Sequence, residues 1–412
     1  MRNDPEGVLI EVEGGEVDAF IAALRSRCPP LARIDSLLES TLPLAHDRDF
    51  TITSTRAGAA SGAAIPADTA LCDACLEELF DPGNRRFLHP FIACCHCGPR
   101  YSMTRSLPYD RAATSMRDFP MCGQCAAEYA DPADCRFHAE PIACHDCGPS
   151  LSSGLADLAR HLQAGEIVAI KGIGGYQLAC DALNNTAVEA LRARKQRDGK
   201  PFAVMVLNTA SASRLANLTP ADAELLGSRE RPVVVLDATA ENKGDGAELS
   251  HAVSGGLATL GVMLPYTALH YLLFHKLLGQ PAGTDWLAQE NDVALVMTSA
   301  NISGDPLIID NHDAEQQLQG IADHVAHHDR EIAGRVDDSV LRALPGQAVL
   351  IRRARGYTPH ALPLARDLAP CLALGAHLKS TITMTRGERA YLSPHLGDLD
   401  TPATVEFLAD SV

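Results

Sequence analysis

The sequence predicts a multidomain α+β protein with a short strand-and-helix segment, two small cysteine-rich modules, a larger α/β domain and the beginning of another domain. Eight of the thirteen cysteines fall into four Cys-x2-Cys pairs of regular spacing, and strand and helix patterns alternate over the residues that follow. The hydrophobic content of 46% is typical of a globular protein. No stretch approaches about 18 consecutive apolar residues, so we find no membrane-spanning candidate.

Residues 1–39 are predicted to form a strand and then a helix. Apolar residues are spread through Val8–Val12, and one helical face follows with Val17, Phe20, Ile21 and Leu24. A single strand and helix cannot bury a core, so we expect this segment to be part of a domain whose beginning is absent. Residues 40–68 are predicted to be a linker, because most residues from Ser54 to Pro66 are Ala, Gly, Ser or Thr.

Residues 69–150 contain two copies of one metal-binding pattern. In each copy eighteen residues separate two Cys-x2-Cys pairs, and the copies begin fifty residues apart. Four thiolates at this spacing enclose a tetrahedral Zn2+ without an open coordination position, so we expect two structural Zn2+ ions and no chemistry at the metals. The predicted ligands are Cys72, Cys75, Cys94, Cys97, Cys122, Cys125, Cys144 and Cys147. Asp81-Pro82 recurs as Asp131-Pro132, which indicates a duplicated zinc ribbon.

The formal net charge of −17 opposes binding to nucleic acid or to an anionic membrane. From Cys72 to Ser150 the chain has seven Arg, no Lys and eleven Asp or Glu, a net of −4, which is the wrong sign for a phosphate-binding surface. We therefore expect neither nucleic acid nor a membrane as a partner. The five other cysteines have no regular spacing, and free thiols of this kind indicate a reducing, cytoplasmic location.

Residues 151–366 are predicted to form an α/β domain, because strands and helices alternate along them. The expected strands are Ile167–Ile170, Ala203–Leu207, Val233–Leu236, Val293–Met297 and Ala348–Arg352, and the expected helices include Thr186–Lys195 and His270–Leu278. Residues 367–412 begin a further domain. There a strand is expected from Leu372, and Thr381–Thr385 and Arg389–Leu392 are expected to form a hairpin around Arg386-Gly387-Glu388.

Two segments of the α/β domain have features of a phosphate site. The turn Lys171–Gly175 follows a strand, where its backbone N–H groups could approach a phosphate, although a tight strand-to-helix turn is the simpler interpretation. Lys195, Arg197 and Lys200 form a local cationic cluster suited to a triphosphate. Cations at the end of a helix also complement its dipole, so a solvated helix end is the alternative for this cluster.

Further polar residues of the α/β domain fit a bound ligand. Ser299 and Asn301 directly follow a predicted strand, and ligands in α/β sheets bind beyond the carboxyl ends of strands, so we favour binding over turn formation. The charged stretches Asp329–Glu331 and Arg335–Ser339, taken alone, are typical of surface ion pairs, and Arg352–Gly356 adds another cationic cluster. Together these groups are what an enzyme handling ATP and a small carbonyl compound requires.

In this order, the parts of the chain resemble those of the HypF family, the carbamoyltransferases of [NiFe]-hydrogenase maturation. The ribbons are similar to that family's zinc module at Cys97–Tyr101, Pro108–Arg111 and Arg136–Ala139. The α/β domain resembles its YrdC-like nucleotide domain at Lys171–Ala182, Lys195-x-Arg197, Thr298–Gly304 and His328–Ile332. By the same resemblance, residues 1–39 are the second half of an acylphosphatase-like (ferredoxin-like) domain, and residues 367–412 start an actin-like ATPase-type transferase domain.

The resemblance implies a chemistry in three steps. In HypF proteins the acylphosphatase domain hydrolyses carbamoyl phosphate to carbamate, and the YrdC-like domain joins carbamate to ATP, with Mg2+, to give carbamoyl-adenylate and pyrophosphate. The last domain passes the carbamoyl group to the C-terminal cysteine of the partner protein HypE. That group becomes the cyanide ligand of the hydrogenase iron.

The resemblance also implies roles for individual residues. Lys195 and Arg197 would bind the phosphates of ATP, and Ser299 and Asn301 would contact the nucleotide or the carbamoyl group, with Lys171 nearby. Five more charged residues would belong to the same cavity, namely Asp329, Arg330, Asp337, Arg352 and Arg355. Asn3, in Arg2-Asn3, matches the asparagine with which acylphosphatases orient the attacking water.

The sequence departs from the family at both ends. The half of an acylphosphatase domain that carries the phosphate-binding loop is missing before Met1, and residues 367–412 match only the opening strands of the transferase domain. We therefore expect a truncated chain in which the adenylation domain alone is complete. Two alternatives are a threonylcarbamoyl-adenylate synthase for tRNA modification, against which the zinc repeat argues, and a non-enzymatic zinc-ribbon scaffold. We expect the active sites on either side of the ribbons, which would hold the flanking domains in a fixed arrangement.

Overall fold

A computed structural model describes residues 1–4, 7–28, 31, 32, 34, 36–46, 49–51, 65–197, 199–238, 248–302 and 304–412. The chain divides into two compact units, Met1–Pro66 and Ala67–Val412. Most of the expected linker from Ser54 to Pro66 lies outside the described residues. Within the described ranges, no helix is long and apolar enough to cross a membrane.

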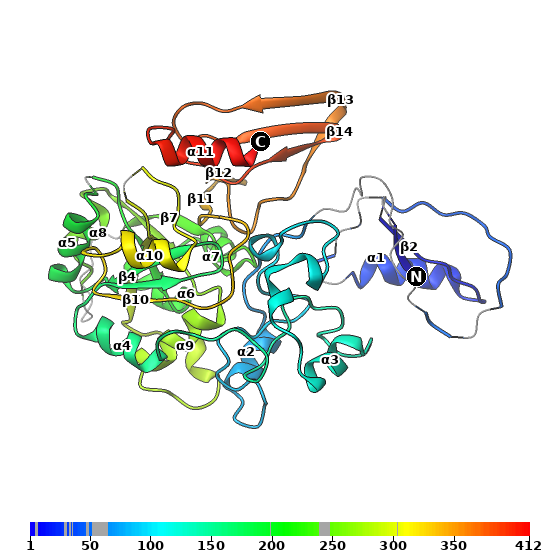
Figure 1. Ribbon diagram of the computed structural model, residues 1–412, viewed down its shortest axis with the longest axis horizontal. Coiled ribbons are helices and arrows are strands. Elements are labelled where there is room, and N and C mark those ends of the chain that lie inside the picture. The colour runs from blue at the N-terminus through cyan, green and yellow to red at the C-terminus, as the bar shows by residue number, and fades with distance from the viewer. Residues whose placement is uncertain are drawn as a thin grey trace. The chain divides into compact units, whose positions relative to one another are not determined.

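The first unit contains a β-hairpin and one helix (Figure 1). Strands β1 (Arg2–Asp4) and β2 (Gly7–Leu9) pair antiparallel, with Asn3 opposite Val8, and helix α1 (Val17–Ser26) follows. No residue of α1 is buried, although its apolar side chains share one face as expected. A hairpin and a single helix therefore do not build a hydrophobic core here.

The second unit begins with the two cysteine-rich modules. Their helices α2 (Asp73–Phe80) and α3 (Gly123–Ala130) each begin directly after the first cysteine of a set. The segment between them contains three short 3-10 helices, η1 (Tyr101–Met103), η2 (Arg111–Ala113) and η3 (Ser115–Asp118). Because regular structure is sparse in this region, the cysteine clusters and the packing on the next domain must provide much of its order.

The α/β domain is built on a ten-stranded mixed sheet with the order β10-β3-β4-β9-β5-β8-β7-β11-β12, and β6 pairs with β7. Its strands are β3 (Val168–Lys171), β4 (Tyr176–Asp181), β5 (Ala203–Val206), β6 (Ala216–Asn217), β7 (Val233–Ala238), β8 (Thr259–Met263), β9 (Ala294–Ser299), β10 (His324–Ala326), β11 (Val340–Leu344) and β12 (Gln347–Arg352). The pairs β10–β3, β5–β8 and β7–β11 are parallel, and the other pairs are antiparallel.

Helices cover both faces of this sheet. The α/β domain contains α4 (Leu155–Gln163), α5 (Asn185–Arg194), α6 (Thr209–Leu215), α7 (Pro220–Gly227), α8 (His251–Ser254), α9 (Ala268–Leu277), η4 (Asp285–Leu287) and α10 (Asn311–Gln317). In β3, Val168 and Ile170 join a buried cluster with α4 and α9, whereas Ala169 joins a second cluster with α5, α6, α7, α8 and α10. The strands and helices expected for the α/β domain are present, each end within two residues.

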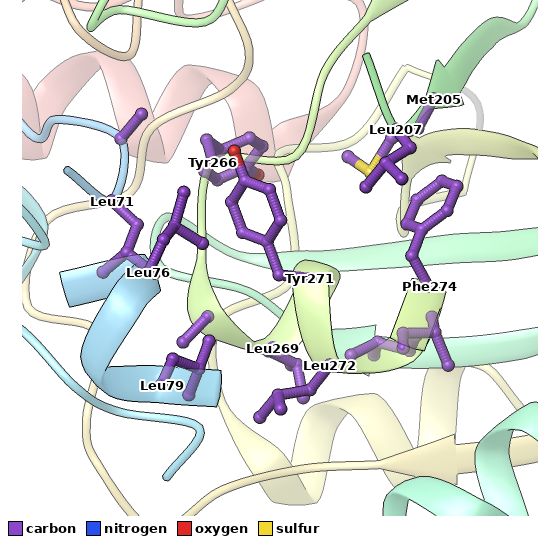
Figure 2. Close-up of a cluster of buried hydrophobic side chains, with 14 of the residues drawn as sticks. Leu71, Leu76, Leu79, Met205, Leu207, Tyr266, Leu269, Tyr271, Leu272 and Phe274 are labelled. Atoms are coloured by element: carbon purple, nitrogen blue, oxygen red, sulfur yellow. The ribbon is translucent and has the colours of Figure 1, made fainter. Parts of the chain in front are cut away.

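The first cysteine-rich module shares the first of these clusters. Leu79 of α2 lies beside Leu269 and Leu272 of α9 in the close-up of Figure 2. Phe80, at the end of α2, meets Trp286 edge-on with the ring centroids 5.1 Å apart. The module is therefore docked on the α/β domain through a common hydrophobic core.

The chain ends with β13 (Leu362–Leu374), β14 (Ile382–Leu392) and α11 (Pro402–Ser411). The hairpin expected around Arg386-Gly387-Glu388 is wrong, because these residues lie inside β14 and Gly387 pairs with Leu368 of β13. Gly387 has a φ of +61°, so it allows an irregularity in a continuous strand instead of a turn. The expected strand start at Leu372 is also wrong, since β13 begins at Leu362.

Candidate functional site

Each set of four cysteines forms one cluster of thiols. In the first, the Sγ atoms of the pairs Cys72–Cys94, Cys94–Cys97 and Cys97–Cys75 are 3.6, 3.7 and 3.6 Å apart. The second cluster, made by Cys122, Cys125, Cys144 and Cys147, has corresponding distances of 3.8, 3.7 and 3.6 Å. Four sulfurs bound tetrahedrally to Zn2+ lie about 3.8 Å from one another. Both clusters therefore fit this ion.

Two buried arginines connect the modules in opposite directions. Arg86 of the first module forms an ion pair with Glu128 of the second and lies 3.6 Å from the Sγ atom of Cys125. Arg136 of the second module forms an ion pair of 2.7 Å with Glu78 of the first, and its guanidinium lies 3.9 Å from a thiol there. A Zn2+ ion with four thiolates carries a net negative charge, which these cations offset. Each module thus supplies a charge that stabilises the other.

Lys195 follows the last turn of α5, and its ammonium is buried within the turn after β9. It donates to the carbonyl oxygens of Ser299 and Asn301, both at 2.7 Å, and to Asn301 Oδ1 at 2.9 Å. The Ser299 hydroxyl donates to the same Oδ1, and Asn301 Nδ2 donates to the carbonyl of Asp305. Burial, assisted by the charge of Arg197, lowers the pKa of Lys195 to about 7. The structure therefore brings three predicted site residues into direct contact, and Lys195 fixes the geometry of the other two.

Arg197, Asp337 and Arg352 form a charged group beside Lys195, in which Arg197 also donates to the carbonyls of Lys200 and Pro201. Asp337 interacts electrostatically with both Lys195 and Arg197, and Arg352 forms an ion pair with Asp337. The Arg197 guanidinium lies 5.1 Å from the ring centroid of Phe202, and burial lowers its pKa to about 10. The three cations Lys195, Arg197 and Arg352 therefore share one carboxylate, that of Asp337. Such an excess of positive charge suits the phosphates of a nucleotide.

Arg355 makes its contacts inside the fold. It donates to Asp338 Oδ1 at 2.9 Å and to the carbonyls of Glu230 and Arg231 at 2.7 and 2.9 Å. Its guanidinium also lies 3.6 Å from the ring centroid of Tyr266. These contacts fix Arg355 against the residues that precede β7 and β11, so the cationic cluster expected over Arg352–Gly356 does not act as one group.

The glycine-rich turn joins β3 to β4, so the expected strand-to-helix turn is wrong. Gly174 approaches Val336 so closely that a Cβ atom would lie 2.2 Å from the Val336 carbonyl oxygen, which only glycine permits. Lys171, at the start of the turn, is buried and donates to Asn311 Oδ1 at 2.6 Å and to the carbonyl of His328 at 3.2 Å. Burial lowers the pKa of Lys171 to about 8.

A cavity of about 40 Å³ lies between the first cysteine-rich module and the α/β domain, and Lys171 lines it. Thr69 and Phe91 are among the walls that the module contributes, whereas His328 and Arg330 come from the domain. Arg330 is buried, with its guanidinium 5.5 Å from the ring centroid of Phe91. The surface position expected for the charged stretch 329–331 is therefore wrong for Arg330. The first module forms part of the wall of this cavity, an arrangement that the sequence did not predict.

The remaining predicted residues occupy other places. Asp329 accepts hydrogen bonds from the backbone N–H and the hydroxyl of Ser150, both at 2.8 Å, and Glu331 pairs with Arg105. These contacts tie the loop that carries Arg330 to the ribbons. Asn3 lies in β1 of the first unit, which is described by itself.

Sequence reasoning missed Asn311, His328 and Phe91 as site residues. Asn311 accepts from Lys171 and, at 2.8 Å, from the hydroxyl of Tyr176, yet it stands 140 residues from Lys171 in the chain. No motif marked it or Phe91. His328 could have been predicted, because it is the first residue of the motif His328–Ile332.

Three family models match this chain. One described as "Telomere recombination" (Sua5_yciO_yrdC) matches residues 160–354, and one described as "HypF finger" matches residues 71–104 and 121–153. A third, described as "HypF Kae1-like domain", matches residues 366–412. The matches follow the ribbons, the α/β domain and the last strands in order.

The chain is also similar to curated HypF proteins and to solved HypF structures. The chain is 52% identical to carbamoyltransferase HypF2 of Cupriavidus necator and 49% identical to carbamoyltransferase HypF of Rhizobium leguminosarum bv. viciae, over 100% and 98% of its own length. It spans about half the length of these relatives, 53% and 52%. A full-length HypF crystallised in a phosphate- and nucleotide-bound form is similar with a TM-score of 0.91 and 41% identity, over 100% of this chain and 53% of that one. The T. kodakarensis HypF structure gives 0.80 and 39%, over 97% and 51%.

Proposed function

Because the chain belongs to the HypF family of carbamoyltransferases over the half of those proteins that it spans, we propose that it serves the formation and transfer of a carbamoyl group. We assign to its α/β domain the reaction of carbamate with ATP. A carbamate oxygen attacks the α-phosphorus, the new O–P bond gives carbamoyl-adenylate, and the bond to the β-phosphate oxygen breaks to release pyrophosphate. We propose carbamoyl phosphate as the source of carbamate and the C-terminal cysteine of HypE as the final acceptor of the protein to which this chain corresponds.

The turn at Ser299 and Asn301 carries this proposal. Lys195 holds a hydroxyl and an amide at the carboxyl end of β9, where ligands of α/β sheets bind, and further cations stand beside them. In the proposed reaction, Arg197 and Arg352 neutralise the phosphates of MgATP while Ser299 and Asn301 orient the nucleotide or the carbamoyl group. Lys195 positions the turn and adds its charge.

Exchange of labelled pyrophosphate into ATP tests the reaction, because it needs only the adenylation step. The chain should catalyse exchange with freshly dissolved ammonium carbamate, and Lys195→Ala combined with Arg197→Ala should weaken ATP binding at least tenfold by calorimetry. Arg160→Ala, whose side chain is 66% exposed, is the matched control. Equal ATP affinity in the double variant would show that the site is wrongly assigned.

Threonylcarbamoyl-adenylate synthesis is the second candidate reaction, because a family model shared with Sua5 and YrdC matches the α/β domain. The same exchange assay, run with threonine and bicarbonate, separates the two candidates. Stronger exchange with threonine would replace carbamate as the proposed substrate.

We further propose that each cysteine cluster holds one structural Zn2+, so the chain should contain two zinc ions by elemental analysis. The spacing of the thiols supports this assignment. All thirteen cysteines are free of disulfides, and this usage favours a reducing compartment such as the cytosol. We do not expect the ribbons to bind nucleic acid, because their net charge is negative.

A further inference from the structure

We propose that the cavity between the first ribbon and the α/β domain binds a small oxyanion of the size of bicarbonate or carbamate, at a place distinct from the turn at Ser299 and Asn301. The existence of this site follows from its own charges and dimensions. Only its natural ligand, carbamate, rests on the proposed function.

The cavity is lined by buried donors that lack an anionic partner. The guanidinium of Arg330 forms no hydrogen bond or ion pair with any residue in the described ranges, and its neighbour is the ring of Phe91. Lys171 donates only to an amide oxygen and a backbone carbonyl, and the carboxylates of Asp310, Asp329 and Glu331 act on its charge without forming an ion pair with it among the described residues. Buried His328 donates its Nε2–H to the carbonyl of Gly172, so its Nδ1 is an acceptor without a partner among the described residues, which suits the hydroxyl of bicarbonate or the amino group of carbamate. Buried cations without a counter-ion are costly, so a bound anion explains why they are retained.

The two carboxylates that act electrostatically on Arg330, Asp68 and Asp329, form no ion pair with it among the described residues. Asp68 interacts electrostatically with Arg330, but its Oδ1 already accepts from the backbone N–H of Arg100 and from the backbone N–H and hydroxyl of Ser102. Burial raises the pKa of Asp68, which reduces the charge it can offer. Asp329, the other carboxylate that acts on Arg330, is bound to Ser150.

The size of the cavity selects the ligand. About 40 Å³ holds roughly three water molecules, which is the room that three or four non-hydrogen atoms need. The residues that line this space do not include Lys195, Arg197, Ser299 or Asn301. The nucleotide and the small anion would therefore occupy different subsites, with Lys195 and Arg197 at the first and Lys171 and Arg330 at the second.

The experiment uses the zinc-loaded full chain and bicarbonate as the probe, because bicarbonate is stable in water. Carbon-13 NMR of labelled bicarbonate should detect binding, and Arg330→Gln and Lys171→Met should each weaken it about tenfold or more. Arg160→Gln, at an exposed position, should bind as the parent does. Affinity for ADP, measured by calorimetry, should change less than twofold in all three variants.

Thermal unfolding distinguishes a binding role from a structural one. Arg330 has no ion pair to lose among the described residues, so Arg330→Gln should not lower the melting temperature. Bicarbonate should raise the melting temperature of the parent and not that of Arg330→Gln. The proposal is overturned if the parent shows no bicarbonate binding at tens of millimolar, if only phosphate binds, or if Arg330→Gln keeps full affinity. A lower melting temperature of this variant without bicarbonate would equally overturn it.

The two proposals fail separately. Bicarbonate binding that depends on Arg330, without any pyrophosphate exchange, would support the anion site and refute the proposed reaction. Exchange with carbamate that is unaffected in Arg330→Gln would support the reaction and refute the anion site.

Discussion

Arg86 and Arg136 stand fifty residues apart in the chain and form equivalent ion pairs in opposite directions across the two ribbons. Each guanidinium leaves its own ribbon and is buried against a glutamate and a thiol of the other. The duplication seen in the sequence is therefore also a duplicated contact in space. The two clusters consequently share their electrostatic surroundings.

Replacing either arginine should loosen the metal cluster of the opposite ribbon. Arg86→Gln removes a buried cation beside Glu128 and Cys125, which should cost about 2 kcal/mol of stability and speed zinc release from the second cluster. Transfer of zinc to a coloured chelator measures the rate. Arg117→Gln, at a side chain 57% exposed, is the control and should leave the rate unchanged. Equal release from Arg86→Gln and the parent would show that the contact does not stabilise the cluster.

Loss of the first zinc cluster should disturb the α/β domain more than loss of the second. Cys94 belongs to the core shared with α9, whereas Cys144 belongs to a small separate cluster. Cys94→Ser should therefore disturb the contact of Phe80 with Trp286, the single tryptophan, and shift its fluorescence to longer wavelength. Cys144→Ser should remove zinc with a smaller shift. The reverse order of the two shifts would contradict the shared core.

Glu140 should make the stability of the ribbons depend on pH. Burial raises the pKa of this carboxyl to about 7, although the hydroxyl of Tyr129 donates to it at 3.0 Å. Because the folded pKa is raised, its stabilising contribution is complete below the unfolded pKa and is lost as the pH rises through about 7. Glutamine does not titrate, so Glu140→Gln does not lose stability over this range. The free energy of unfolding of the variant, relative to that of the parent, should therefore increase by about 1 kcal/mol from pH 6 to pH 8. Denaturant melts at both values measure it, and a pH-independent difference would refute the assignment.

Asn301 should matter for the nucleotide more than for folding. Its Oδ1 accepts from both Lys195 and Ser299, so Asn301→Ala removes one of the three acceptors of the lysine and frees the hydroxyl to adopt other positions. ATP affinity should fall about tenfold while the melting temperature changes by only a few degrees. Calorimetry and thermal unfolding give the two numbers. Asn185→Ala, which loses two hydrogen bonds of a side-chain amide on α5, to Glu189 and from Ser250, is the control.

The zinc clusters and part of the candidate nucleotide site could be predicted from the sequence, because the motifs that mark them are local. The cysteine pairs lie within a short span, and zinc geometry leaves little freedom in how they close. Lys195 and Asn301 are distant in the chain, but each sits in a motif at the end of an expected element. Their contact could therefore be anticipated from the resemblance.

Other features had no local signal. Phe91 reaches the cavity, and Asn311 reaches Lys171, only through tertiary packing. The charge of Arg330 suggested a surface position, whereas its side chain is buried at the cavity. Gly387 shows a second limit of prediction from the sequence. A positive φ suits a hairpin turn and an irregular strand equally well, and only the pairing with Leu368 distinguishes them.

The shared core around α2 and α9 also determines where this protein can be divided. The sequence suggests a cut near residue 151, between the ribbons and the α/β domain. A fragment that begins there would expose the side chains of Leu269, Leu272 and Trp286. Together they form a hydrophobic patch, which favours aggregation. A fragment designed to carry the α/β domain should therefore retain the first ribbon, whose helix α2 covers these side chains.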